Sequence, residues 1–268
     1  MTKIPRKVSE RLTKEVRSFQ RVLSKAKDRD VNESDTVTII ADMLSNVFGF
    51  DKYTEVTSEQ AIRGTYCDLA TKLDGSIKYL IEVKAIGMNL KENHLRQAVN
   101  YGANQGIPWV VLTNGIDWEI YKIRFERPVS NELVCSFNFI ELNPRKPEDH
   151  DKVFLLCKEG IATAAIEEFH THVQSVNRFM IGAIMITEPV LSTIRRELRK
   201  ASRGLKVTNE EIERIIVSEL FKRDVIEGEP FENAKRQLKK AIKKKQPKRI
   251  PVNNEGPIDL TDDSKESL

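Results

Sequence analysis

Apolar residues along this chain change their spacing twice, which predicts three successive regions. In the first region they recur every three or four positions over 9–27 and over 33–47, as in amphipathic helices. Asn32 or Ser34 is placed to cap the second helix, and Gly49 follows its end. The chain therefore begins with two helices.

The middle region has the short apolar runs of β-strands. Extended segments are expected at 53–57, 66–73, 77–85, 109–113 and 117–123. The Asp74-Gly75 pair between the second and third segments predicts a hairpin, and a helix is expected over 93–104. We therefore expect an α/β domain over 31–145, with a mixed central sheet flanked by helices.

Beyond Pro144 and Pro147 the pattern is helical again. Helices are expected at 151–171, 175–186, 189–201, 208–221 and 230–245. Thr208 and Glu211 have the spacing of a capping box for the fourth of them. The expected organisation is a basic N-terminal helix (1–30), the α/β domain, an all-helical module (150–246) and a disordered acidic tail (247–268).

Composition excludes several classes of protein. Of 268 residues, 40% are hydrophobic and 31% charged, which is typical of a soluble globular chain. No apolar stretch is long enough for a membrane span, so no membrane partner is expected. The three cysteines have no short spacing, which argues against disulfides and zinc and favours a cytoplasmic location. No Gly-Lys pair occurs, so a phosphate-binding loop and a bound nucleotide are not expected.

The net charge of +4 hides opposed blocks. Residues 1–29 sum to +7 and residues 190–250 to +9, whereas 30–189 sum to −8 and 251–268 to −4. Basic segments attract polyanions such as nucleic acids. An acidic centre is unfavourable for a polyanion unless its carboxylates bind metal ions. The alternative is that the basic segments are solvated helix faces.

The candidate chemistry lies in three charged residues in apolar surroundings: Asp68, Glu82 and Lys84. Glu82 and Lys84 are two apart on one expected strand, so their side chains leave the same face. Burial of such charges is costly without partners, and a divalent ion between the carboxylates would offset that cost. Carboxylate oxygens suit Mg²⁺, which assists phosphodiester hydrolysis. A structural salt bridge near a sheet edge is the alternative.

Three further motifs follow these residues along the chain. They are a Gln-x-x-x-Tyr pair (Gln97, Tyr101), the run Val-Val-Leu-Thr-Asn-Gly at 110–115 and the run Trp-Glu-Ile-Tyr at 118–121. With them, residues 32–125 resemble the PD-(D/E)xK nuclease superfamily, and most closely the N-terminal nuclease domain of type I restriction enzyme R subunits. Cys67 stands where the family name has proline. The helicase of an R subunit has no counterpart in this chain, where a helical module follows instead.

The resemblance implies a restriction-endonuclease-like core that uses Mg²⁺ or Mn²⁺. Asp68 and Glu82 would bind the metal with the Val83 carbonyl, and Lys84 would orient the attacking water. Glu33 matches a helical acid that assists metal binding, although a first-turn acid favoured by the helix dipole is an equal alternative. Gln97 and Tyr101 would support the site or contact the substrate backbone, or else be a surface amide and a core aromatic.

The resemblance also implies DNA as substrate, cut to 5′-phosphate and 3′-hydroxyl ends in bacterial, archaeal or phage defence or DNA processing. DNA contacts are expected from basic residues of the helical module: Arg195, Arg196, Arg199, Lys200, Arg203, Lys239, Lys240, Lys243 and Lys244. A homo-oligomer or a larger defence complex is a further expectation. The alternative function is a catalytically silent nucleic-acid-binding or interaction subunit of a restriction-type complex.

Overall fold

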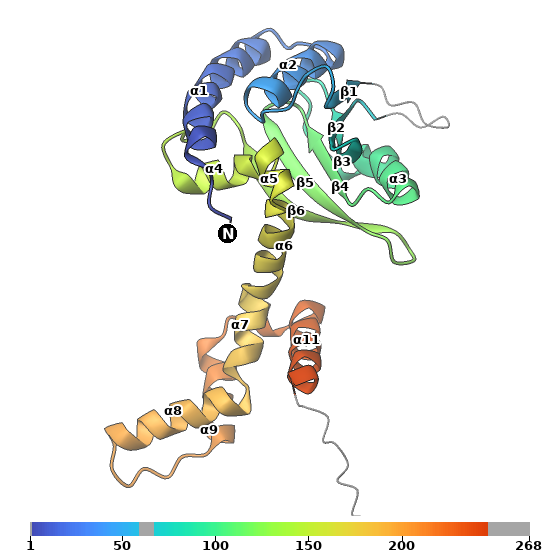
Figure 1. The fold of residues 1–268 in the computed structure, drawn as a ribbon. Helices are drawn as coiled ribbons and strands as arrows, with labels where there is room; N and C mark the ends of the chain where they lie inside the picture. Colours follow the sequence, from blue (N-terminus) through green and yellow to red (C-terminus); the bar gives the residue numbers. More distant parts are fainter. Residues whose placement is uncertain (1, 59–66, 246–268) are drawn as a thin grey trace, which may run out of the picture. The chain divides into compact units, whose positions relative to one another are not determined.

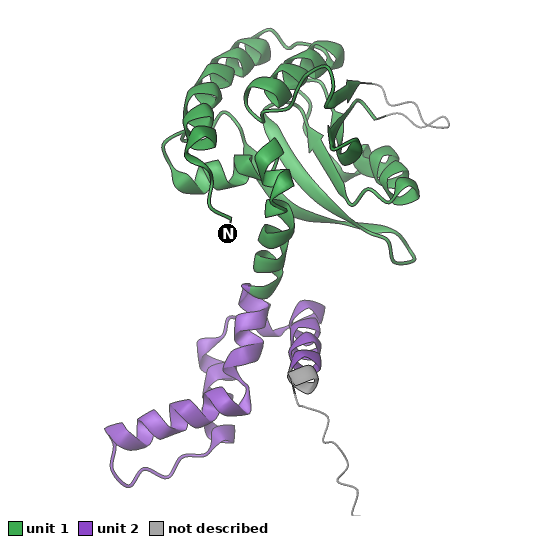
Figure 2. Cartoon of the chain, in the orientation of Figure 1, with its two compact units in different colours: residues 1–175 green, residues 176–268 purple. Residues whose placement is uncertain are grey.

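The chain forms two compact units. The computed structural model describes residues 2–58 and 67–245, with side chains described as far as residue 241. Unit 1 is Met1–Ser175 and unit 2 is Val176–Leu268 (Figure 2). The predicted tail 247–268 lies outside the described residues.

Unit 1 is built on a six-stranded sheet in which the strands follow one another in chain order (Figure 1). The strands are β1 Val56–Ser58, β2 Leu69–Leu73, β3 Ser76–Val83, β4 Trp109–Thr113, β5 Asp117–Arg124 and β6 Ser130–Asn138. β3 and β4 are parallel, and the other neighbouring pairs are antiparallel. The carboxyl ends of β3 and β4 therefore lie at the same edge of the sheet.

The β2–β3 hairpin confirms the turn predicted from sequence. Leu73 pairs with Ser76, and both turn residues have positive φ, 51° at Asp74 and 75° at Gly75. Such angles are those of a two-residue type I′ turn, which matches the twist of the strands. β6 was not predicted, because its first residues, Ser130–Glu132, are polar and its apolar residues begin only at Leu133.

Helices cover both faces of this sheet (Figure 1). α1 (Arg6–Asp28) and α2 (Glu33–Asn46) pack on one face through buried residues such as Leu12, Phe19 and Ile40. The 3₁₀ turn η1 (Glu92–Leu95) and α3 (Arg96–Gln105) pack on the other. The predicted mixed sheet with flanking helices is thus confirmed.

Side chains of β3 alternate between the two hydrophobic cores, one on each face of the sheet. Ile81 and Val83 lie in the cluster shared with α1 and α2, whereas Leu80 lies in the cluster shared with α3. Because side chains alternate along a strand, Glu82 follows Leu80 onto the α3 side. Its position in the pleat places a carboxylate in a largely apolar setting.

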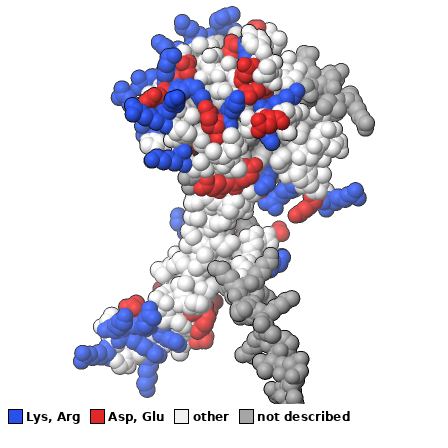
Figure 3. Space-filling model, in the orientation of Figure 1, with Lys and Arg blue, Asp and Glu red and all other residues white. Residues whose placement is uncertain are grey.

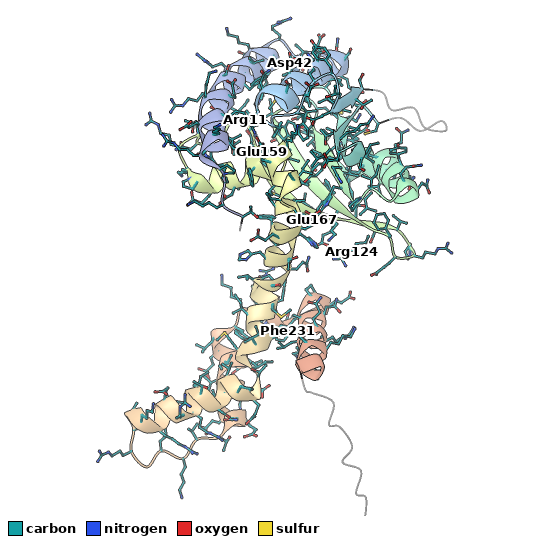
Figure 4. All side chains as sticks on the ribbon, viewed as in Figure 1. Arg11, Asp42, Arg124, Glu159, Glu167 and Phe231 are labelled. Carbon is teal, nitrogen blue, oxygen red and sulfur yellow. The ribbon has the colours of Figure 1, made fainter. Side chains whose placement is uncertain are left out.

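The single helix predicted over 151–171 is wrong, because the chain forms α4 (Pro147–Phe154), α5 (Lys158–Ala162) and α6 (Ala165–Ser175). Ala164 has φ 53°, a left-handed conformation that interrupts the helix. α5 is joined to α1 by two hydrogen bonds of 2.7 and 2.8 Å from the Arg11 guanidinium to the Glu159 carboxylate (Figure 4). α4, α5 and α6 belong to unit 1, so the expected helical module of 150–246 is divided between the units.

Unit 2 is helical throughout its described residues. Its helical elements are α7 Arg178–Met185, α8 Glu188–Ala201, α9 Asn209–Ile215, the π-helical turn η2 Ile216–Leu220, α10 Arg223–Ile226 and α11 Glu229–Lys245. Phe231 of α11 packs with Ala183 of α7 in one small core (Figure 4), and Leu191 of α8 packs with Ile212 and Ile216 in another. None of the described helices combines the length and apolar character that crossing a bilayer requires.

Candidate active site

The β2–β3 hairpin brings Asp68 and Glu82 together. Leu69 pairs with Ile81, so the next residues, Asp68 and Glu82, stand opposite each other where the two strands end. Oδ2 of Asp68 accepts a hydrogen bond of 2.7 Å from the Val83 backbone N–H. The two carboxylates predicted to act together therefore share one end of the hairpin.

Glu82 is a buried carboxylate, with 7% of its surface exposed. Burial raises the pKa of the Glu82 carboxyl, and the nearby Asp68 carboxylate adds to this effect, while a hydrogen bond from Lys84 opposes it. A positive charge beside Glu82 thus favours its ionised form. A buried acid that depends on a neighbouring cation is characteristic of functional sites.

Lys84 supplies that positive charge. Its Nζ lies 2.9 Å from Oε1 of Glu82 and donates a hydrogen bond of 2.7 Å to the Val83 carbonyl oxygen. Burial disfavours the charged form of Lys84, but the carboxylates around it, Glu82 first, raise the pKa of its ammonium group. The amine is therefore held at the carboxyl end of β3, beside both acids.

Glu33 joins this group from another element. Oε2 of Glu33 lies 3.3 Å from the Lys84 Nζ, and its side chain is 48% exposed. Glu33 is the first residue of α2, whose N-terminus is capped by the Asn32 side chain accepting from the Asp35 N–H. The cap fixes where the helix begins, and so places Glu33 over the end of β3.

The turn after β4 stabilises the same sheet edge. The Lys84 N–H donates to the Thr113 carbonyl at 2.8 Å, which continues the parallel pairing one residue beyond β3. The buried Asn114 accepts hydrogen bonds from the N–H groups of Ile116 and Asp117, and its amide donates to the Met88 carbonyl. Asn114 thus links the loop after Lys84 to the turn after β4. Its signal in the sequence was the Asn-Gly pair after a buried strand.

Cys67, the residue before Asp68, has a buried thiol. Its Sγ is 3.2 Å from both the Leu69 and the Ile81 carbonyl oxygens. Burial raises the pKa of this thiol to about 12, so it stays protonated. The side chain therefore links the start of β2 to β3.

The donor set at this edge suits a hard divalent ion. The Asp68 and Glu82 carboxylates and the Val83 carbonyl offer oxygen atoms alone, the donors that Mg²⁺ and Mn²⁺ prefer. Among the described residues, no group of three or more His, Cys, Asp or Glu side chains is arranged to hold a metal. An ion bound here would thus have two carboxylate ligands, with the backbone carbonyl and water completing its shell.

Gln97 and Tyr101 lie in different environments on α3. Gln97 is exposed. Tyr101 is 2% exposed and packs in the cluster that contains Cys67, Leu80 and Val110. Tyr101 is therefore close to the start of β2, whereas nothing among the described contacts brings the Gln97 side chain to the acids.

Changing Tyr101 to phenylalanine is expected to leave the free energy of unfolding unchanged or to raise it by up to about 1 kcal/mol. The buried Tyr101 hydroxyl has no hydrogen-bond partner among the described residues, so its removal costs no bond. The matched control is Tyr121→Phe, which deletes a 2.7 Å bond to Glu119 and should cost about 1 kcal/mol. Urea unfolding followed by tryptophan fluorescence measures both. A loss of more than about 1 kcal/mol in Tyr101→Phe would show that the hydroxyl is bonded in solution.

The predicted DNA-contacting residues lie in unit 2. Arg195, Arg196, Arg199 and Lys200 are on α8, Arg203 follows it, and Lys239 and Lys240 are on α11. Lys243 and Lys244 are in α11 too, but their side chains are outside the described set. Glu197 forms ion pairs with Arg196 and Lys200, at 3.3 and 3.0 Å. Figure 3 shows Lys and Arg side chains gathered at the end of α8.

Comparison with known proteins agrees with the resemblance seen in the sequence. Residues 40–134 match the family described as the type I restriction enzyme R protein N terminus. The matched segment begins within α2 and ends within β6, and it contains Asp68, Glu82 and Lys84 but not Glu33. Searches of curated proteins and of solved structures gave no match. The match lies entirely within unit 1.

Proposed function

We propose that this chain is a Mg²⁺- or Mn²⁺-dependent endonuclease that hydrolyses phosphodiester bonds in DNA, as part of a restriction-type defence system. The observation that carries the proposal is the meeting of Asp68, Glu82 and Lys84 at one end of β3. It falls within the segment that matches the R-protein family. Two acids and an amine at one strand end are what metal-assisted hydrolysis of a phosphodiester requires.

In the proposed mechanism, Asp68 and Glu82 would hold the divalent ion together with the Val83 carbonyl. When bound, the ion supplies Lewis acidity toward the phosphoryl oxygen and acidifies a water molecule. Lys84 orients the attacking water and balances the negative charge that grows on the phosphoryl oxygens. Glu33 is a positioning residue, because its carboxylate lies 3.3 Å from the Lys84 amine.

The basic residues of α8 and α11 would contact the DNA backbone. Of these, Arg196, Arg199, Lys200, Lys239 and Lys240 are exposed, and contacts of this kind add salt-dependent affinity without sequence preference. A larger restriction complex is the proposed setting, in line with the R-protein family. Tyr101 is proposed to support the start of β2, with which it shares a cluster, and the exposed Gln97 to contact the substrate backbone.

A catalytically silent subunit is the second candidate, and the Lys84 contacts favour it. The Lys84 amine bonds both Glu82 and the Val83 carbonyl, as a purely structural ion pair would. In that case the fold would bind nucleic acid or a partner protein without cutting. Divalent-ion binding separates the two candidates.

Titration of Mn²⁺ into the protein, followed by calorimetry, is the direct test. The wild type is expected to bind the ion, and Asp68→Asn to bind it at least about tenfold more weakly, because one carboxylate ligand is lost. The asparagine oxygen can still accept the Val83 N–H, so the hairpin remains intact. The matched control is Asp74→Asn, an exposed acid in the hairpin turn.

The same preparations should nick supercoiled plasmid with Mg²⁺, except Asp68→Asn, and none should do so in EDTA. A wild type that neither binds the ion nor cuts DNA would establish the silent-subunit function instead.

A further inference from the structure

One flank of α1 carries a row of basic side chains in the same unit as the candidate active site. We call it the α1 ridge, and it consists of Arg17, Arg21, Lys25 and Arg29, which follow one another at intervals of four residues. All four are exposed, and none forms an ion pair with another described residue. Nearer the start of α1, Arg6 pairs with Glu10, Arg11 with Glu159 and Lys14 with Glu15. Figure 3 shows Lys and Arg side chains projecting along α1.

The ridge has a fixed geometry. The opposite side of α1 is buried through residues that include Val16, Phe19 and Leu23. Between the ridge residues, the Gln20 amide lies 2.7–3.2 Å from the carbonyl oxygens of Phe139, Ile140 and Leu142. The helix is thus held on the segment after β6. Arg17, Arg21 and Lys25 follow one another at intervals of four residues, about 6 Å along the axis.

A shallow, open groove lies beside these residues. It has a volume of about 710 Å³ and is lined by Arg17, Gln20, Arg21, Ser24 and Lys25. All five lining residues have a polar or charged group, and three of them are positively charged. A groove of this chemistry suits an anionic ligand with several regularly spaced charges.

The ridge leads to the candidate active site. Leu23 of α1 contacts Gly115, in the turn after β4. The Asp30 carboxylate, one residue beyond the ridge, sits so close to Gly87 that a side chain at that position would collide with it. Gly87 follows Lys84 by three residues, and Glu33 begins the next helix. The end of the ridge therefore adjoins the loop that leaves the candidate site.

We propose that the α1 ridge binds the phosphate backbone of duplex DNA and guides it to the acids at the end of β3. This inference rests on the proposed function and assigns its substrate-binding surface to unit 1. Residues 30–189 sum to −8, so the acidic centre needs adjoining positive charge to hold a polyanion. No aromatic residue belongs to the ridge, which disfavours recognition of single strands by base stacking.

The test replaces Arg17, Arg21 and Lys25 together by alanine, which preserves helix propensity. Binding of a fluorescent DNA duplex is measured by anisotropy in EDTA across a range of salt concentrations. Loss of three phosphate contacts should weaken binding about 100-fold near 0.15 M salt and reduce the salt slope by about 3. The matched control replaces three other exposed basic residues of unit 1 without a described ion pair: Arg127, Arg145 and Lys146.

Several outcomes would overturn the inference. If the ridge variant binds the duplex as tightly as the wild type, or if the control variant loses as much affinity, the α1 ridge has no special role in DNA binding. Equal ridge-dependent binding of the wild type to anionic lipid vesicles would indicate a membrane surface instead. The binding assay does not measure cleavage, so the two proposals can fail separately. If the protein needs the ridge to bind DNA but does not cut it, this inference is supported and the proposed nuclease function is wrong.

Discussion

Lys84→Ala is expected to lower the rate of plasmid cleavage by about 10³-fold, because the charge that stabilises the developing phosphoryl oxyanion is lost. The amine contacts Glu82 at 2.9 Å, Val83 at 2.7 Å and Glu33 at 3.3 Å, so no other described cation takes its place. Nicking and linearisation of plasmid in Mg²⁺, timed for each variant, give the measurement.

The control for Lys84→Ala is Lys78→Ala. Lys78 is on β3, the strand that Lys84 directly follows, but near its other end, and it has no ion pair among the described residues. Its replacement should leave cleavage unchanged. Circular dichroism and tryptophan fluorescence verify that each variant is folded. Equal cleavage by the wild type and Lys84→Ala would remove the assigned site.

Trp118→Ala is expected to reduce the free energy of unfolding of unit 1 by about 3–5 kcal/mol. The indole is fully buried, lies 5.2 Å from the Phe48 ring and 6.2 Å from the Phe137 ring, and donates a hydrogen bond to the Gly115 carbonyl. Its removal opens a large cavity between the sheet and α2 and leaves that carbonyl without its partner. Gly115 is in the turn beside the candidate site, so we expect the loss of this hydrogen bond to disturb the candidate site as well.

Urea unfolding measures this loss. The chain has two tryptophans, Trp109 and Trp118, both in unit 1, so Trp109 reports unfolding of that unit in the variant. Tyr53, 91% exposed, provides the control, because Tyr53→Ala should change the free energy by less than about 0.5 kcal/mol. An unchanged midpoint for Trp118→Ala would contradict the packing described above.

Elements with strong local signals were predicted well. β4 has the predicted bounds, Trp109–Thr113, because a short run of apolar residues next to a turn has few alternatives. α2 begins at the predicted Glu33, where Asn32 caps it. β6 was missed because its first half pairs with β5 through backbone hydrogen bonds, which the side-chain pattern does not record.

The candidate site, too, was predicted only in part. Asp68, Glu82 and Lys84 could be singled out because charges in an apolar strand pair are costly without partners. Sequence could not show that Val83 donates to Asp68, that Lys84 bonds the Val83 carbonyl, or that Asn114 links two loops. These contacts depend on backbone positions in neighbouring strands.

By itself, the sequence determined the alternation of strands and helices, the hairpin at Asp74-Gly75 and the identity of the two acids and the amine, since each follows from local periodicity or from the cost of burying charge. Only the tertiary structure decided that Glu33 meets Lys84 and that α1 ends beside the loop after β3. Glu33 and Lys84 are 51 positions apart, and their meeting depends on how α2 packs against the sheet. Packing between distant elements is cooperative, so no local pattern encodes it.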